Sequence, residues 1–336
     1  MRTALLLIHG FLTCTDDWDV LLPHYSALYD EVVLFKQPGH ERADEKPHFR
    51  DFSADSAYAA LDETINSLSG FDAVDVVGHS MGGGMALYAA SRLANVRRAL
   101  VFAPAFRYPR PGTFARQGAM FRDYRAFTAE VKDEGFARVL REKEDYSHKA
   151  LSGSVDLFFK RLLPHWSVRN IINFMRIMAR ARKTMESVKC PLCVMYGELD
   201  EFLPFSSARE VLEKTSSREK YFIRYGLKGH ALTYLGDCSD VIADSVEFLS
   251  GGNPLSRTPE KAELRAAYRL LRGAATDKIV TATFDEQTFS SGGSDAVVRR
   301  RRVTETYLDG GAGFFAHLEK FVFIKTRKRP PAKEGG

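Results

Sequence analysis

Ser80, in Gly78-His79-Ser80-Met81-Gly82, is the residue of this sequence whose setting points most directly to chemistry. The five residues fit G-x-S-x-G, a pattern that puts a serine on a sharp turn between a strand and a helix. The apolar run Ala73–Val77 precedes the motif, and a helical pattern extending to about Ala94 follows it. Glycines two residues to either side let other backbone approach such a turn closely. The sequence therefore predicts Ser80 as a nucleophile at the carboxyl end of a sheet.

A serine hydroxyl attacks well when a base removes its proton and an acid orients that base. With this motif the partners follow in the order serine, acid, histidine. Asp200 comes directly after the apolar run Leu192–Tyr196, and His230 comes after the next run and before a helix. We predict these two as the partners of the serine. Glu198 and Glu201 are rival acids, of which Glu198 is nearer the strand end and Glu201 is expected to point away.

The other histidines suit the role of base less well. His9 is fixed by the first strand, and His79 flanks the nucleophile. The rest precede the acid in the chain: His24, His40, His48, His148 and His165.

The oxyanion of an acyl-transfer intermediate needs two backbone N–H donors set in place beforehand. One is the N–H that follows the nucleophile, on Met81. The other is expected from the loop after the first strand, where His9-Gly10-Phe11 stands. Gly10 lets the backbone turn inward, so we predict the N–H of Phe11 as the second donor.

Six apolar runs of strand length must position these residues. Helical patterns lie between them, for example Phe52–Leu68 with apolar residues three and four apart. Alternating strands and helices predict an α/β fold, a mostly parallel sheet flanked by helices. The runs are Ala4–Ile8, Glu31–Phe35, Ala73–Val77, Arg98–Phe102, Leu192–Tyr196 and Tyr221–Tyr225.

The stretch 104–189 interrupts this alternation. It is rich in helix formers and aromatic residues and contains no clear strand, so we predict a helical cap of three to five helices. Its aromatic residues either line a pocket or pack the insertion's own core. They are Phe114, Phe121, Tyr124, Phe127, Phe136, Phe158, Phe159, Trp166 and Phe174.

The pattern changes again after the linker signal Ser250-Gly-Gly-Asn-Pro254. We predict a first domain over 1–252 and a small C-terminal α+β extension over 253–325. This extension is expected to have a helix over Thr258–Leu271, followed by antiparallel strands over Lys278–Phe289, Ala296–Leu308 and Lys320–Lys325. These strands could cover an exposed sheet edge or mediate a homodimer. The basic tail 326–336 is predicted to be disordered.

Composition bounds the class of protein. Hydrophobic residues make up 45% of the 336 residues, as in a packed globular chain. The early apolar stretch Ala4–Ile8 is too short for a membrane span or secretory signal, so we expect a cytoplasmic protein. Cys190 and Cys193 have C-x-x-C spacing but open an apolar run, so we read them as buried strand residues.

The motifs Leu7-Ile-His-Gly-Phe11, Gly78-His-Ser-Met-Gly-Gly83, Gly197-Glu-Leu-Asp200 and Gly229-His230 together resemble the α/β-hydrolase superfamily. The likeness is greatest to small bacterial carboxylesterases and monoacylglycerol lipases of the serine aminopeptidase-like group. It covers residues 3 to about 251 and implies the same triad, the same two oxyanion donors and a cap at 104–189. One segment departs from the pattern: relatives often read Asp-x-x-Gly-His-Gly-x-Ser where this chain has Lys36-Gln-Pro-Gly-His-Glu-Arg42.

Two substrate classes remain open. One is a small-molecule carboxylic ester with a short or medium acyl chain, held by an aromatic pocket. The other is an anionic substrate such as an acyl thioester, favoured by the 18 basic against 9 acidic residues of 104–189. The cations considered for this role are Arg176, Arg180, Arg182 and Lys183. A carbon–carbon lyase with the same triad belongs to this second class.

A ligand-binding scaffold without catalysis is disfavoured because all three members of a triad are present. The basic runs Arg299–Arg302 and Lys325–Arg329 could bind nucleic acid or anionic lipid. In a strand, however, alternate residues face opposite sides, so a solvated edge is favoured and no nucleic acid is expected. The sequence predicts no cofactor and no metal.

Overall fold

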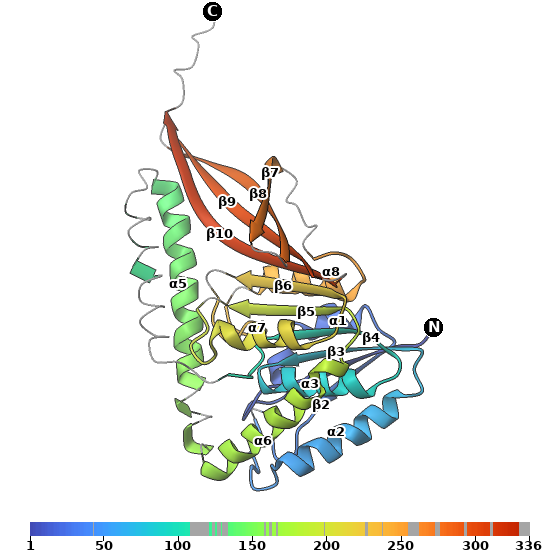
Figure 1. Ribbon diagram of the computed structural model, residues 1–336. Coiled ribbons are helices and arrows are strands. Elements are labelled where there is room, and N and C mark those ends of the chain that lie inside the picture. Colours follow the sequence, from blue (N-terminus) through green and yellow to red (C-terminus); the bar gives the residue numbers. More distant parts are fainter. Residues whose placement is uncertain are drawn as a thin grey trace, which may run out of the picture.

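The computed structural model describes residues 1–42, 44–107, 121–122, 125, 129, 134–157, 159–160, 163–165, 167–197, 199–225, 228–236 and 238–254. It also describes the backbone of 262–272, 276–291, 294–309 and 312–328. These residues form one sheet with helices on both faces (Figure 1).

Six parallel strands form the first part of the sheet, in the order β2-β1-β3-β4-β5-β6. This confirms the predicted mostly parallel α/β sheet. The strands are β1 (Thr3–Ile8), β2 (Glu31–Phe35), β3 (Ala73–His79), β4 (Val96–Phe102), β5 (Leu192–Gly197) and β6 (Glu219–Tyr225). Because they are parallel, their carboxyl ends all meet at one edge of the sheet.

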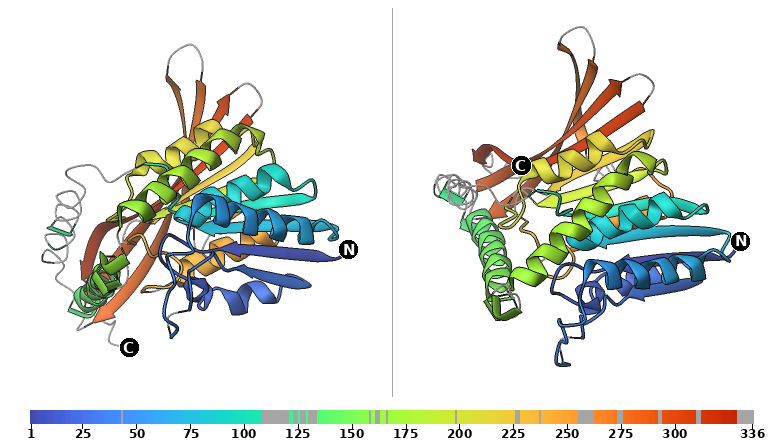
Figure 2. Two further views of the ribbon diagram at one scale, coloured as in Figure 1. Left: turned by 90° about the horizontal axis from the view of Figure 1, so that it is seen from below. Right: turned by 60° about the horizontal axis from the view of Figure 1, so that its bottom comes forward.

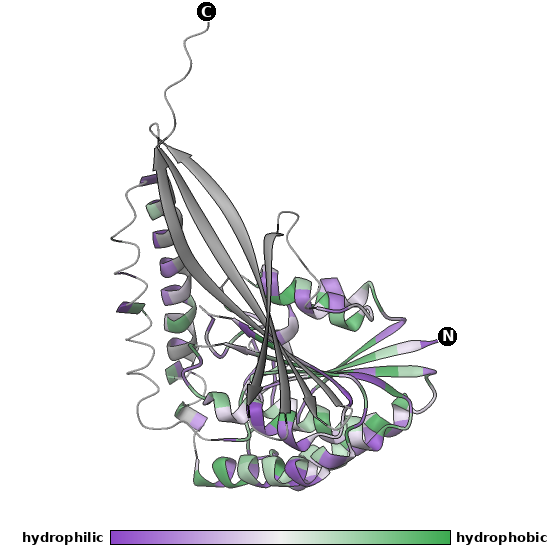
Figure 3. Ribbon diagram, turned by 45° about the horizontal axis from the view of Figure 1, so that its top comes forward, coloured by the Kyte–Doolittle hydropathy of each residue, from purple (hydrophilic) through white to green (hydrophobic). Residues whose placement is uncertain are grey.

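Helices cover both faces, so the central strands carry apolar residues toward each side. Leu6 and Ile8 of β1 pack into one core, and Leu5 and Leu7 pack into the other. One face carries α2 (Ala54–Leu68), α3 (Met81–Arg92), α6 (Val168–Thr184) and α7 (Phe205–Lys214), and the other carries α1 (Leu22–Ser26) and α8 (Ser239–Leu249) (Figure 2). Figure 3 shows the strands near the N-terminus as largely hydrophobic and the helices with hydrophilic and hydrophobic sides.

The turn between β3 and α3 packs tightly against the end of β1. A Cβ atom added at Gly82 would overlap the carbonyl oxygens of Ile8 and His9. One added at Gly78 would overlap the backbone of Gly82. These two glycines of the G-x-S-x-G motif therefore hold three backbone segments in contact.

Gly82→Ala is expected to lower the free energy of unfolding by about 3 kcal/mol or more, because rigid backbone would have to move to admit the methyl group. Gly70→Ala is the matched control, since nothing lies within 4 Å of a Cβ at that position. Chemical denaturation of both variants measures the difference. Equal stability of the two would contradict the close packing at the turn.

The stretch between β4 and β5 is helical wherever the structure describes an element of it. It contains α5 (Glu134–Leu157), α6 and the short 3₁₀ turns Leu163–His165 (η3) and Met185–Ser187 (η4). Helix α6 packs on the main face, where the Tyr58 hydroxyl of α2 donates to the Ile177 carbonyl at 2.8 Å. Helix α5 stands at the carboxyl end of the strands (Figures 1 and 2), where Gly153 lies against Leu235. Six of the aromatic residues named for this stretch lie outside the residues whose side chains the structure describes: Phe114, Tyr124, Phe127, Phe136, Phe158 and Trp166.

The C-terminal stretch adds four long strands to the same sheet, in the order β10-β9-β8-β7 after β6. They are β7 (Ala262–Arg272), β8 (Thr276–Ser291), β9 (Ser294–Asp309) and β10 (Ala312–Lys328). Neighbours among these four are antiparallel, whereas β10 pairs in parallel with β6 over Gly313–Leu318. The extension thus covers the edge that β6 would otherwise expose.

Two sequence predictions for this stretch are wrong. The helix expected over Thr258–Leu271 is strand β7 from Ala262, because pairing with β8 overrides the helix preference of its alanine, leucine and arginine residues. The predicted disorder of the tail fails for Thr326–Lys328, which continue β10 opposite Ala296 and Ser294. Residues 329–336 lie outside the described residues.

All four cysteines are buried. Burial raises the pKa of Cys190 to about 12 and also raises that of Cys193, which keeps both thiols protonated. This agrees with their interpretation as strand residues. Among the described residues, no helix has the length and hydropathy of a membrane span.

Candidate active site

Ser80 occupies a strained turn between β3 and α3. Its φ is +56° and its ψ is −117°, a conformation that residues with a Cβ rarely adopt. The turn is fixed by backbone bonds: the N–H of Ser80 donates to Phe102 at 2.8 Å, and its carbonyl accepts from Gly83 and Ala105. Only 9% of the residue is exposed. The predicted strand–turn–helix context is present, and it presents the hydroxyl at the carboxyl edge of the sheet.

Three residues predicted from separate segments meet at this edge. The Nε2 atom of His230 lies 3.0 Å from the Ser80 hydroxyl, and its Nδ1 atom lies 2.9 Å from Oδ2 of Asp200. Asp200 is fully buried, and its other oxygen accepts from the backbone N–H groups of Phe202 and Leu203 at 2.9 and 2.7 Å. With a proton on Nδ1 donated to Asp200, Nε2 is the acceptor that faces the serine.

Charge around His230 favours its protonated form. Burial alone would lower the pKa of this imidazole, but the carboxylates of Asp200, Glu201 and Asp17 more than offset burial and raise it. The ring can therefore take a proton from the serine and hold it as an imidazolium. This is the electrostatic requirement for a general base in acyl transfer.

Glu201 differs from the sequence expectation that it points away. Its Oε2 atom accepts the backbone N–H of His230 at 3.0 Å, and the side chain is buried. A Cβ added at Gly229 would lie 2.8 Å from that oxygen, so the glycine before His230 makes room for the carboxylate. That glycine is the sequence signal that could have revealed the contact. The other rival acid, Glu198, lies outside the described residues.

Glu201→Gln is expected to move the acidic limb of the pH profile of kcat/KM to lower pH. The variant keeps an oxygen to accept the His230 N–H but removes one of the charges that raise the pKa of the ring. Because the unprotonated ring is the base, a lower pKa leaves more of it active in acid. The plateau rate should fall by no more than about tenfold, since one hydrogen bond is weakened. An unchanged limb would show that Glu201 does not act on His230.

His79 is hydrogen-bonded to the loop that carries His230. Its Nε2 donates to the carbonyl of His230 at 3.0 Å, and the two rings lie 4.9 Å apart. Its Nδ1 lies 3.8 Å from the buried carboxylate of Asp17, which accepts from the Thr13 hydroxyl at 2.5 Å. The sequence marked His79 as a neighbour of the nucleophile but gave no sign of this contact or of Asp17.

The loop after β1 lies against the nucleophile. A Cβ added at Gly10 would lie 3.4 Å from that of Ser80, so Phe11 follows at the edge of the site. Leu12 has a φ of +56°, and its N–H donates to Nε2 of His40 at 3.2 Å. Nδ1 of His40 lies 3.0 Å from the Pro38 carbonyl, so the two ring nitrogens join the loop after β1 to the segment after β2. Gly10 thus adjoins Ser80, and the roles of Phe11 and Met81 as oxyanion donors stay a prediction.

An aromatic surface adjoins the same loop. The ring of Phe11 lies 5.0 Å from Phe174 of α6 and 5.9 Å from Phe52. Phe202 lies edge-on to His230 at 5.3 Å. Phe174 of the cap therefore contacts a predicted site residue.

Two of the four cations first considered for an anionic substrate are engaged elsewhere. Arg182 pairs with Glu210 at 2.6 Å. Arg180 lies 4.2 Å over the Tyr58 ring and 3.6 Å from Asp62. These two arginines join α6 to neighbouring helices, so their charge does not indicate a substrate.

Comparison with known proteins agrees with this architecture. Residues 3–163 match the family described as alpha/beta hydrolase fold. No curated protein matches the chain. A structure of the metagenome-derived lipolytic enzymes LipS and LipT is 17% identical with a TM-score of 0.52, covering 74% of this chain and 94% of that one. Monoacylglycerol lipase from Paleococcus ferrophilus is 18% identical with a TM-score of 0.53, at the same coverages.

The sheet order and the strand–turn–helix at Ser80 define a protein with the α/β-hydrolase fold. The family match over residues 3–163 supports a place in the α/β-hydrolase superfamily.

Proposed function

We propose that this protein is a serine hydrolase that cleaves a carboxylic ester through an acyl-enzyme. The observation that carries the proposal is the unbroken chain from the Ser80 hydroxyl through His230 to Asp200, with distances of 3.0 and 2.9 Å. A hydroxyl, an imidazole acceptor and a buried carboxylate in this order are the parts that acyl transfer needs. The lipases among structures of similar fold are consistent with this activity.

The reaction follows from the positions of these groups. His230 takes the proton of Ser80 as the oxygen bonds to the ester carbon, and the negative charge on the carbonyl oxygen is met by the N–H groups of Phe11 and Met81. Collapse breaks the ester C–O bond, and the leaving alcohol takes the proton from His230. Water then attacks the acyl-enzyme by the same steps and releases the acid. Asp200 keeps its charge and stabilises the imidazolium.

Labelling with a fluorophosphonate tests the nucleophile. The wild-type protein should form one covalent adduct, located on Ser80 by peptide mass spectrometry, and Ser80→Ala should form none. An adduct on another residue, or equal labelling of both proteins, would overturn the assignment. A panel of p-nitrophenyl esters of rising chain length beside acyl thioesters then separates the two substrate classes.

Two further predictions concern the whole chain. A cytoplasmic location stays a prediction of the sequence. So does a homodimer through the C-terminal strands, for which the described pairing leaves β7 as the outermost strand of the sheet. Size-exclusion chromatography with light scattering, on the full chain, tests the dimer.

A further inference from the structure

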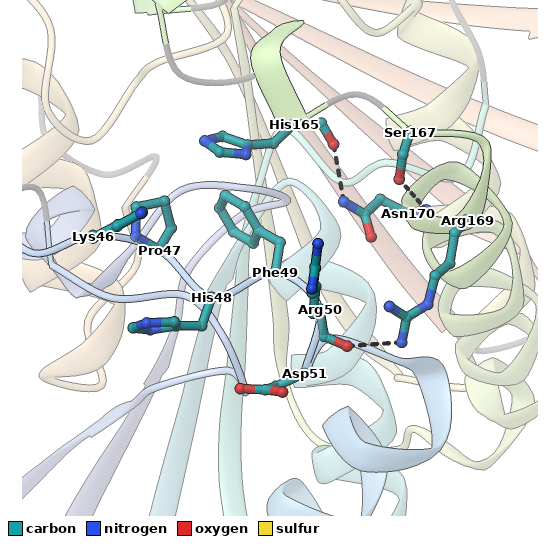
Figure 4. A pocket seen from close by; sticks show the side chains of 10 residues that line it. All are labelled: Lys46, Pro47, His48, Phe49, Arg50, Asp51, His165, Ser167, Arg169 and Asn170. Atoms are coloured by element: carbon teal, nitrogen blue, oxygen red, sulfur yellow. Dashed lines mark hydrogen bonds between the residues drawn. The ribbon is translucent and has the colours of Figure 1, made fainter.

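A cavity of about 630 Å³ lies between the segment 46–51 and the first turn of α6 (Figure 4). The segment follows β2, and the helix begins at Val168 after its cap residue Ser167. The two walls are joined by the guanidinium of Arg169, which donates to the carbonyl of Arg50 at 2.7 Å. Figure 4 shows this bond and the side chains around the space.

The side chains that line this cavity carry more positive than negative charge. Lys46, Arg50 and Arg169 line it, beside the single acid Asp51. Within the described part of the chain, none of these three cations forms an ion pair. Other arginines do: Arg97 with Asp75, Arg107 with Glu210, and Arg209 with Glu213. Uncompensated cations in a concave site attract an anion more strongly than the same charges on a convex surface.

The start of α6 adds to the positive potential of the cavity. The helix has 17 residues, and Ser167 caps the N–H of Asn170 at 3.2 Å. The first N–H groups of a helix and its dipole favour a negative group at this end. Two guanidinium groups, an ammonium group and a helix start together suit a dianion with several oxygens better than a single carboxylate.

Aromatic contacts connect the cavity to the loop at Ser80. Phe49 lines the cavity and lies 4.9 Å from the ring of His40, which holds the loop after β1. His40 lies 4.8 Å from Phe52, and Phe52 lies 5.9 Å from Phe11. A few ring contacts thus separate the cavity from the predicted oxyanion donor. The rings of Phe49, His40 and Phe52 pack between the cavity and the loop that carries Phe11.

We propose that this cavity binds the phosphate group of the substrate, so that the ester or thioester cleaved at Ser80 has a phosphate-bearing leaving group. The proposal rests on the hydrolase function proposed above and specifies its substrate class. The leaving alcohol or thiol departs with the phosphate attached, and the acyl group stays on Ser80 until water releases it.

Two matched substrates test the proposal: the butyryl ester of glycerol and the same ester of glycerol phosphate. Arg50→Gln and Lys46→Gln should each raise KM for the phosphate ester about tenfold, as expected for one lost charge-assisted hydrogen bond. KM for the neutral ester and kcat for both should stay unchanged. Arg176→Gln is the control, an exposed cation of the same helix that does not line the cavity. Equal effects on both esters, or no effect on either, would overturn the proposal.

Calorimetry with inorganic phosphate separates this proposal from that for Ser80. The wild-type protein and Arg176→Gln should bind phosphate, and Arg50→Gln should bind it at least tenfold more weakly. If the wild-type protein cleaves neither ester but binds phosphate in this way, the hydrolase function fails and the cavity is still an anion site. If it cleaves the neutral ester and binds no phosphate, the cavity proposal fails and the hydrolase function stands.

Discussion

Ser80→Ala is expected to lower kcat for ester hydrolysis by roughly 10⁴- to 10⁶-fold, as for other enzymes that lose a serine nucleophile of a triad. No other described hydroxyl is hydrogen-bonded to the Nε2 atom of His230, so no other described residue is positioned to replace Ser80 as the nucleophile. The turn itself should persist, because its backbone bonds from Ser80 to Phe102, Gly83 and Ala105 do not involve the side chain. Steady-state kinetics on the best ester of the panel measures the loss.

Ser80→Gly supplies a matched second variant that separates catalysis from strain. Both replacements remove the hydroxyl, but alanine keeps the Cβ atom in a conformation with φ of +56° and ψ of −117°. Strain of this kind costs about 1–3 kcal/mol, and glycine in the folded chain costs about 0.5–1 kcal/mol in entropy. We expect Ser80→Gly to be about 1 kcal/mol more stable than Ser80→Ala and equally inactive. Activity within a hundredfold of wild type in either variant would show that another group is the nucleophile.

The sequence predicted the parts of the site that depend on topology. Ser80, Asp200 and His230 each follow a strand of a parallel sheet, so their meeting at one edge follows from recognising the strands. Hydrophobic periodicity is enough for that, because buried strands and amphipathic helices differ in their repeat. The same periodicity predicted the strand, turn and helix around Ser80.

The sequence did not predict the contacts that the loops make. Glu201 turns toward the His230 N–H because Asp200 accepts two backbone bonds and so sets the turn that follows it. His40 accepts from Leu12 across 28 positions of the chain, in a segment that departs from the pattern of relatives. No periodicity encodes such bonds, since they depend on loop dihedrals and not on a repeating face.

The charged cavity was missed for a related reason. Lys46 and Arg50 lie in one loop, whereas Arg169 lies at the start of a helix, 119 residues after Arg50. Counting charge over 104–189 drew attention instead to Arg180 and Arg182, which pair with acids on neighbouring helices. Local charge density therefore identified an excess of cations but not the three that form no ion pair among the described residues. Strand β7 shows the same limit, because pairing with β8 decides its structure and helix propensity does not.

Asp200→Asn is expected to lower kcat by roughly 10³- to 10⁴-fold while the turn around it stays intact. Oδ1 of Asp200 accepts from Phe202 and Leu203, and Oδ2 faces Nδ1 of His230 at 2.9 Å. An asparagine that keeps both backbone bonds must present its NH₂ group to His230. The ring then accepts at Nδ1 and carries its proton on Nε2, where it donates to the serine instead of accepting from it.

Glu201→Gln is the control for charge, since it also removes a carboxylate beside the ring but leaves the tautomer free. If loss of negative charge were the whole effect, the two variants would be about equally slow. A much slower Asp200→Asn assigns the difference to the position of the proton. In that case, the Nδ1 resonance of His230 in ¹⁵N NMR should move from the protonated to the unprotonated range in the asparagine variant alone. A retained Nδ1 proton together with activity within tenfold of wild type would exclude Asp200 as the acid that orients His230.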